Sequence, residues 1–247
     1  REQLARWRDE PLLQQLFWNR GLRSEQQALA FVRREYVLES DPFQLAGMDA
    51  AVVRVLAALD AGERIAVYGD YDVDGVTATL LLVELLHAFD ADVRPYIPRR
   101  SEEGYGLNNT ALEELAAEGV GLVVTVDCGV RALEQAEHAR TLGLELIISD
   151  HHHLGDVLPP AVAVINPKRA DCHYPEQMLS AVGIAYKIAS ALLTRRTPSQ
   201  AAYSAQSFLD LVALGTVADL APLCGENRHL VHAGLQQLNS TPRQGVR

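Results

Sequence analysis

Three aspartates recur at every second position in the segment YGDYDVDGVTAT. An extended backbone would project the carboxylates of Asp70, Asp72 and Asp74 to one side, before Gly75 turns the chain into a helix. Carboxylates this close repel one another and raise one another's pKa unless a cation offsets their charge. We therefore predict a catalytic divalent-metal site here, with a polar turn capped by an aspartate as the alternative. An EF-hand loop fits less well, because Leu81 stands where that loop carries a glutamate.

Further candidate ligands follow two later apolar runs. Asp127 ends the run VVTVD, and Asp150 and His151 follow the run IIS. Each signal is weak alone, because an aspartate before a turn is common and a lone histidine is more often a surface or packing residue. Together with the first group, they combine imidazole with several carboxylates. This ligand set suits Mn²⁺, Fe²⁺ or Zn²⁺, is most typical of Mn²⁺, and is compatible with Mg²⁺.

Two ambiguities remain at the level of the residues. His151, His152 and His153 are consecutive, so their side chains cannot all face the same ligand. Asp219 follows a helical run and is an ordinary helix exit on its own evidence, and Asp210 offers the same chemistry nine residues earlier. Which of these residues are ligands depends on which of them the fold brings close to the other candidate ligands.

The elements that would position these residues follow an alternating pattern. Short apolar runs occur at RIAVYG, VRPYIP, LVVTVD, LELIISD and AVAVINP, and helical segments are expected at about 75–89, 108–118, 131–142, 179–195 and 204–218. This alternation predicts an α/β fold, a doubly wound and mainly parallel five-stranded sheet with helices on both faces. Ligands bind beyond the carboxyl ends of the strands in such sheets, which is where the candidate ligands fall.

Composition and residue patterns also limit the domain organisation and the class of protein. Residues 1–60 have helical patterns, so we expect a helical N-terminal segment followed by a catalytic domain over residues 61–247. The chain opens on Arg1 and ends abruptly, and we expect it to be part of a longer protein. The net charge of −10 argues against a module that binds nucleic acid by charge alone. Three dispersed cysteines and the absence of a long apolar stretch favour a cytoplasmic protein that does not enter a membrane.

Four segments together resemble the motifs of the DHH phosphoesterase superfamily. They are DYDVDG, VDCG, SDHH and GTVADLAPL, in this order. Within the superfamily, the chain is similar to the RecJ family of single-strand-specific 5′→3′ DNA exonucleases, notably in EEGYGLN and LSAVGIAYKIASALL. The resemblance implies two-metal hydrolysis of single-stranded DNA from its 5′ end, in DNA repair and recombination. The alternatives are another DHH phosphoesterase, acting on oligonucleotides, cyclic dinucleotides or pyrophosphate, and a non-catalytic scaffold of the same fold.

The resemblance also implies roles for residues. It assigns two divalent cations, Mn²⁺ or else Mg²⁺, to six ligands: Asp70, Asp72, Asp74, Asp127, His151 and Asp219. It implies that Asp127 bridges the two cations and that His152 faces the scissile phosphate as a catalytic residue. Asp150 would orient the neighbouring histidine, while His153 has no role in the family. Longer family members continue into a DHH-associated domain and an OB-fold, neither recognisable here.

Candidate substrate contacts lie in the segment PRRSEEGYGLN. They are Arg99, Arg100, Gly104, Tyr105, Gly106 and Asn108. The two arginines follow the second strand, and the helix expected near Asn108 could receive a phosphate at its N-terminus. The alternatives are a solvated arginine pair and an asparagine that caps a helix, and Tyr105 could stack on a base or pack against the loop. The expected partner is single-stranded DNA, joined in longer family members by a helicase or a single-strand-binding protein.

Overall fold

The structure, a computed structural model, describes residues 7, 9–33, 40–199, 203–241 and 243–246. The chain divides into two compact units, Arg1–Glu39 and Ser40–Arg247. In the first unit, α1 (Pro11–Asn19) and α2 (Glu25–Arg33) enclose the buried side chains of Phe17 and Ala28. The expected helical character of this part is therefore present, and residues 34–39 lie outside the described residues.

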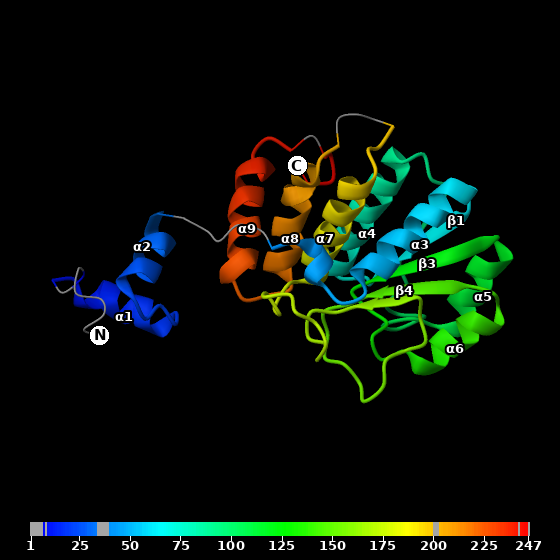
Figure 1. Cartoon of the computed structure of the whole chain (residues 1–247), viewed down its shortest axis with the longest axis horizontal. Coiled ribbons are helices and arrows are strands. Elements are labelled where there is room, and N and C mark those ends of the chain that lie inside the picture. Colours follow the sequence, from blue (N-terminus) through cyan, green and yellow to red (C-terminus); the bar gives the residue numbers. More distant parts are fainter. Residues whose placement is uncertain (1–6, 8, 34–39, 200–202, 242, 247) are drawn as a thin grey trace. The chain divides into compact units, whose positions relative to one another are not determined.

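A five-stranded, all-parallel sheet forms the centre of the second unit (Figure 1). Its strands are β1 (Arg64–Tyr68), β2 (Val93–Tyr96), β3 (Val120–Val126), β4 (Glu145–Ser149) and β5 (Ala163–Ile165). Their order across the sheet is β2-β1-β3-β4-β5. The order reverses between β1 and β3, and such a switch point opens a crevice at the carboxyl ends of the strands. The predicted doubly wound parallel sheet is confirmed.

Helices cover both faces of this sheet. The helices of this unit are α3 (Met48–Ala61), α4 (Val73–Ala88), α5 (Asn109–Ala117), α6 (Leu133–Thr141), α7 (Ala181–Arg195), α8 (Leu209–Ala218) and α9 (Gly225–Leu238), with short 3₁₀ turns at Pro42–Gln44 and Ala205–Phe208. Figure 1 shows α3, α4 and α7 on one face and α5 and α6 on the other. Within the described residues, no helix is long and apolar enough to cross a membrane.

Alternating side chains of each strand build two cores. Ile65 and Val67 of β1 join the core beneath α4 and α7, whereas Ala66 and Tyr68 join the core beneath α5 and α6. This two-sided burial explains why the strands read as continuous apolar runs. The second unit begins at Ser40, so it includes α3, which the sequence groups with the helical segment before residue 61. α3 lies here because it packs on α7 and β5.

Candidate metal centre

Three groups of potential metal ligands lie at the carboxyl ends of β1, β3 and β4. Within each group the ligand atoms lie within 4.8 Å of one another. The groups are Asp127, His151 and His152; Asp74, His151 and Asp219; and Asp70, Asp72 and Asp127. Because Asp127 and His151 each belong to two groups, the three groups form one continuous cluster. All six ligands expected from the sequence fall within this cluster.

The first aspartate segment does not have the expected extended backbone. Helix α4 begins at Val73, and the side chain of Asp72 caps it by accepting the N–H of Gly75 at 2.9 Å. Asp74 therefore lies in the first helical turn and joins a different ligand group from Asp70 and Asp72. The expected extended backbone is wrong at Asp74, because the helix starts two residues before the glycine. A β-carbon on Gly75 would come within 2.7 Å of the Asp70 backbone, so glycine allows this close turn.

The N-terminus of α7 holds Asp74 in place. Its carboxylate oxygens Oδ2 and Oδ1 accept the N–H groups of Ala181 and Val182 at 2.7 and 2.9 Å. N–H groups at the start of a helix have no partner within the helix and carry the positive end of its dipole, which favours a carboxylate. These bonds lower the pKa of Asp74, but burial and the charge of Asp127 outweigh them and raise it to about 7. The segment LSAVG, which supplies this helix start, thus has a structural task that the sequence alone does not reveal.

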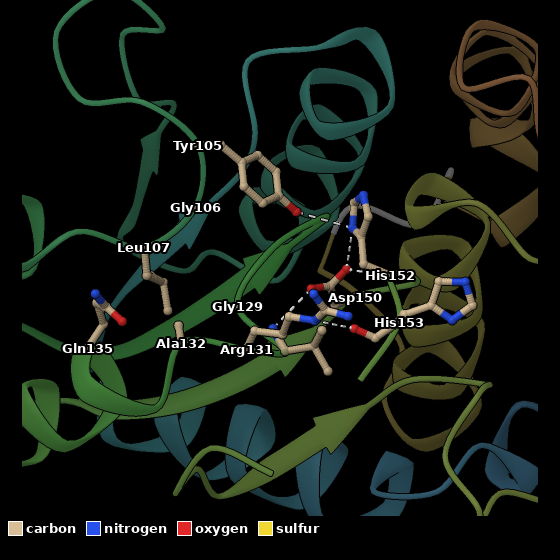
Figure 2. A pocket seen from close by; sticks show the side chains of 11 residues that line it. Tyr105, Gly106, Leu107, Gly129, Arg131, Ala132, Gln135, Asp150, His152 and His153 are labelled. Atoms are coloured by element: carbon tan, nitrogen blue, oxygen red, sulfur yellow. Dashed lines mark hydrogen bonds and ion pairs between the residues drawn. The ribbon is translucent and has the colours of Figure 1, made fainter. Parts of the chain in front are cut away.

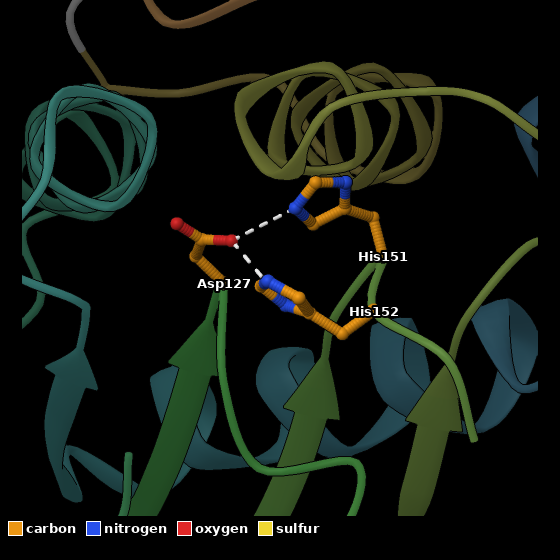
Figure 3. A group of neighbouring side chains, drawn as sticks. All are labelled: Asp127, His151 and His152. Atoms are coloured by element: carbon orange, nitrogen blue, oxygen red, sulfur yellow. Dashed lines mark ion pairs between the residues drawn. The ribbon is translucent and has the colours of Figure 1, made fainter. Parts of the chain in front are cut away.

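Asp127 lies at the centre of the cluster (Figure 3). Its Oδ1 is 3.1 Å from His151 Nε2 and 3.8 Å from His152 Nδ1. Oδ1 of Asp127 and Nε2 of His151 are buried, and neither has a hydrogen-bond partner among the residues that the structure describes. Burial and the charge of Asp72 raise the pKa of Asp127 to about 9. Buried polar atoms without a hydrogen-bond partner, next to several carboxylates, are what a bound cation would satisfy.

His151 connects Asp127 to the remaining ligands. Its Nε2 lies 4.0 Å from Asp74 Oδ2, and its Nδ1 lies 3.9 Å from Asp219 Oδ2. Burial lowers the pKa of His151, which favours the neutral imidazole that can coordinate a metal. Asp219 ends α8 and also reaches the cluster. Its competitor Asp210 is fully buried elsewhere, where both carboxylate oxygens accept bonds from Arg243 Nη1 at 2.8 and 2.7 Å.

His152 is bonded to Asp150. Its Nδ1 lies 2.8 Å from Asp150 Oδ1, and Oδ2 of Asp150 accepts the N–H of Val130 at 3.0 Å. Burial alone would raise the pKa of Asp150, but the hydrogen bonds from His152 and Val130 lower it. The bond to Asp150 in turn raises the pKa of His152. Asp150 occurs in none of the three ligand groups within the described chain, and it contacts the histidine instead.

Side chains from other segments hold the backbone of the histidine run, residues 151–153. Lys168 Nζ donates to the carbonyl of the first histidine, Asn166 Nδ2 to that of the second at 2.9 Å, and Arg131 Nε to that of the third at 2.8 Å. Lys168 and Arg169 lie beyond the fifth strand. Lys168 thus makes a hydrogen bond within the protein, and Arg169 forms an ion pair with Asp171. Asn166 and Arg131 were missed from the sequence, because no motif marks a residue whose task is to hold a distant carbonyl.

The two candidate arginines of the loop after β2 are exposed. Arg99 pairs with Glu102 at 3.3 Å, and the guanidinium of Arg100 lies 5.0 Å from the centroid of the Tyr71 ring. Asn108 is the N-cap of α5, where its Oδ1 accepts a backbone N–H at 2.7 Å. The helix-capping alternative for Asn108 therefore describes its side chain.

A pocket of about 420 Å³ adjoins His152 (Figure 2). Its walls are the segments 105–107 and 129–132, together with Gln135, Asp150, His152 and His153. Gly104 and Gly106 have φ angles of 77° and 87°, which let the first segment turn around Tyr105. This size is within the range of small-molecule sites. The pocket thus lies where part of a substrate could sit beside the cluster of potential metal ligands.

The family comparison agrees with this geometry. Residues 64–216 match the N-terminal domain of the DHH family. Over 237 residues, the chain is 40% identical to the single-stranded-DNA-specific exonuclease RecJ of Bacillus subtilis, and over 238 residues it is 39% identical to RecJ of Escherichia coli. These alignments include 96% and 93% of the chain but 29% and 41% of the two relatives. The chain thus spans less than half the length of these relatives.

Solved structures are also similar. Exonuclease RecJ bound to manganese has a TM-score of 0.74 and 38% identity, covering 82% of this chain and 51% of that one. RecJ of Thermus thermophilus in complex with Mn²⁺ has a TM-score of 0.73 and 33% identity, covering 94% of this chain and 32% of that one.

Proposed function

We propose that this chain, which belongs to the DHH family, is the metal-dependent part of an exonuclease that hydrolyses single-stranded DNA from its 5′ end. The observation that carries the proposal is the cluster of three ligand groups that share Asp127 and His151. The relatives named for this activity support the choice of substrate. Roles in DNA repair and recombination, a cytoplasmic location, and partnership with a helicase or a single-strand-binding protein belong to the same proposal.

The ligand cluster fits two divalent cations. Carboxylates and an imidazole are suitable ligands for Mn²⁺, and the similar structures were solved with Mn²⁺. Asp70, Asp72 and Asp127 would hold one cation, and Asp74, His151 and Asp219 the other, with Asp127 adjoining both through its position beside His151. When bound, such cations polarise a phosphodiester, lower the pKa of water and offset charge on the leaving oxygen.

The residues around the cluster would orient the substrate and handle a proton. Asp150 binds Nδ1 of His152, so Nε2 on the other side of the ring would meet the scissile phosphate. From there it would donate a hydrogen bond to the developing charge or assist proton transfer. Arg99 and Arg100 are exposed, and we assign them to phosphate groups farther along the strand. Gly104, Tyr105, Gly106 and Asn108 would shape the adjoining loop and pocket.

A panel of substrates tests this proposal. The chain, with Mn²⁺, would be given single-stranded DNA, double-stranded DNA, a dinucleotide, a cyclic dinucleotide and pyrophosphate. We expect single-stranded DNA to be hydrolysed fastest, and EDTA to abolish the reaction. Preferential hydrolysis of one of the small substrates would favour another DHH phosphoesterase. Failure to bind Mn²⁺, measured by calorimetry, would reject both enzyme hypotheses in favour of a scaffold.

A further inference from the structure

The hydroxyl of Tyr105 connects two parts of the catalytic edge. It donates a hydrogen bond to the backbone carbonyl of Asp127 at 3.0 Å. It also lies 3.1 Å from Nδ1 of His152 (Figure 2). The rings of Tyr105 and His152 also meet edge to face, with centroids 5.7 Å apart. Neither base stacking nor packing against the loop, the two roles expected for Tyr105, accounts for this placement of the hydroxyl.

The direction of each hydrogen bond follows from the acceptors around His152. Oδ1 of Asp150 accepts the backbone N–H of His152 at 3.0 Å and lies 2.8 Å from its Nδ1, while Oδ2 accepts the N–H of Val130. An ionised carboxylate only accepts, so Nδ1 of His152 carries the proton. The Nδ1–H is then shared between Asp150 Oδ1 at 2.8 Å and the Tyr105 oxygen at 3.1 Å, and the proton of Tyr105 goes to the carbonyl of Asp127. Nε2 of His152 is left for the substrate.

The backbone of Asp127 also depends on this contact. Its φ angle of 65° lies in the left-handed region, which non-glycine residues rarely adopt without support from their surroundings. On one side, the N–H of Asp127 donates to the carbonyl of Ser149 at 3.0 Å. On the other, its carbonyl accepts the bond from Tyr105. The two bonds hold the residue that two ligand groups share.

We propose that Tyr105 is a positioning residue whose hydroxyl sets the orientation and tautomer of His152 and holds the backbone of Asp127. This inference rests on the proposed function of the site. The glycines on either side of Tyr105 adopt positive φ angles, and their turn brings the hydroxyl to His152. Tyr105 thereby ties the loop of Arg99 and Arg100 to the residue that faces the scissile phosphate.

Removing only the hydroxyl tests this role. Tyr105→Phe keeps the ring, and Tyr96→Phe is a matched control, because the Tyr96 hydroxyl donates to Glu103 of the same loop at 2.6 Å. We would measure Mn²⁺-dependent hydrolysis of the p-nitrophenyl ester of thymidine 5′-phosphate. Tyr105→Phe should lower kcat about 10–100-fold with little change in KM, as for other residues that orient a catalytic group. Tyr96→Phe should stay near wild type, and equal losses in both variants would reduce the role to tethering the loop and overturn the proposal.

A double-mutant cycle then shows whether Tyr105 acts through His152. If it does, Tyr105→Phe should cost little further activity in a His152→Ala background, because the group that it positions is gone. The same fold loss in both backgrounds would overturn the claim that Tyr105 positions His152. So would a rise in KM with unchanged kcat, which is the result expected of a direct substrate contact.

Nuclear magnetic resonance gives a readout that needs no turnover. In the ¹⁵N-histidine-labelled chain with Mg²⁺, we expect His152 to carry its proton on Nδ1, and the Nδ1–H resonance to move in Tyr105→Phe but not in Tyr96→Phe. The His152→Ala variant assigns the resonance. An Nδ1 without a proton, or a resonance that does not move, would overturn the inference. The expected spectra without any hydrolysis by wild type would instead reject the proposed function and leave the hydrogen-bond assignment standing.

Discussion

The three consecutive histidines occupy three different environments. His151 is largely buried, with its Nε2 3.1 Å from Asp127 Oδ1. His152 is bonded to Asp150, whereas His153 is exposed and its carbonyl accepts a bond from Arg131. A run that looks uniform in the sequence thus supplies a candidate ligand, a candidate catalytic residue and a residue outside the cluster.

Alanine at the first and third histidine separates these environments. His151→Ala removes a member of two ligand groups, so we expect Mn²⁺ affinity to fall by about 100-fold or more and turnover to be nearly lost. His153→Ala is the matched control and should keep both within about twofold, because its exposed side chain belongs to none of the three ligand groups. Calorimetry and strand cleavage measure the two quantities. Comparable losses in both variants would contradict the assignment.

The second histidine should behave differently from the first. His152→Ala removes a candidate proton-transfer group but leaves Asp74, His151 and Asp219 in place. We expect kcat to fall by about 10²–10⁴-fold, the usual value of such a group, while Mn²⁺ affinity stays close to wild type. Should calorimetry show a loss of affinity as large as for His151→Ala, His152 would have to be counted among the ligands.

The sequence could predict those ligands that lie at the ends of strands. Asp127 and His151 end parallel strands, and the common edge of a parallel sheet brings such residues together. Asp74 could not be separated from Asp70 in this way, because its direction depends on where α4 begins. The choice of Asp219 over Asp210 was made on family resemblance, and the Arg243 ion pair now gives the physical reason.

Three helices converge on Asp74 and determine how it is held. The first turn of α7 donates two N–H groups to its carboxylate, α4 carries the residue, and Gly215 of α8 lies directly against it. The ends of these helices are therefore as important for the candidate site as its ligands. Periodicity predicts the helices themselves, but their close approach depends on packing that only the fold shows.

Gly215→Ala tests this helix convergence. Its β-carbon would come within 2.4 Å of Thr77 Oγ1 and 2.7 Å of Asp74 Oδ1, so α8 would have to move. We expect the free energy of unfolding to fall by about 1–3 kcal/mol, and Mn²⁺ affinity to fall with it. Gly155→Ala in the loop after the histidine run is the control, since its β-carbon would come no closer than 3.8 Å to the carbonyl oxygen of Val157. Denaturation and calorimetry on both variants would show equal effects if the convergence were unimportant.

The charge of the molecule links metal binding to its stability. The net charge is −10, and several buried carboxylates of the second unit crowd one edge of the sheet. The pKa values of Asp74 and Asp127 are raised, because burial and neighbouring carboxylates disfavour their ionised forms. A cation bound to the folded chain would relieve this repulsion and stabilise the fold.

Thermal unfolding measures this link. At a Mn²⁺ concentration about 100 times its Kd, binding adds about 2.7 kcal/mol, which corresponds to a rise in Tm of about 5–10 °C for a chain of this size. EDTA should reverse the rise. Ca²⁺, which prefers a larger all-oxygen cage, should raise Tm less. A Tm that does not respond to Mn²⁺ would show that the cluster binds no cation in the folded chain.

We propose that metal binding at Asp127 is required for cleavage of single-stranded DNA. Single strands labelled at the 5′ or the 3′ end test this requirement when they are incubated with Mn²⁺ and either wild type or Asp127→Ala, whose folding is checked by circular dichroism. We expect Mn²⁺-dependent release of nucleotides from the 5′ end by wild type. Asp127→Ala should bind Mn²⁺ far more weakly and release none. Undiminished cleavage by the folded Asp127→Ala chain would show that cleavage does not depend on a metal held by Asp127.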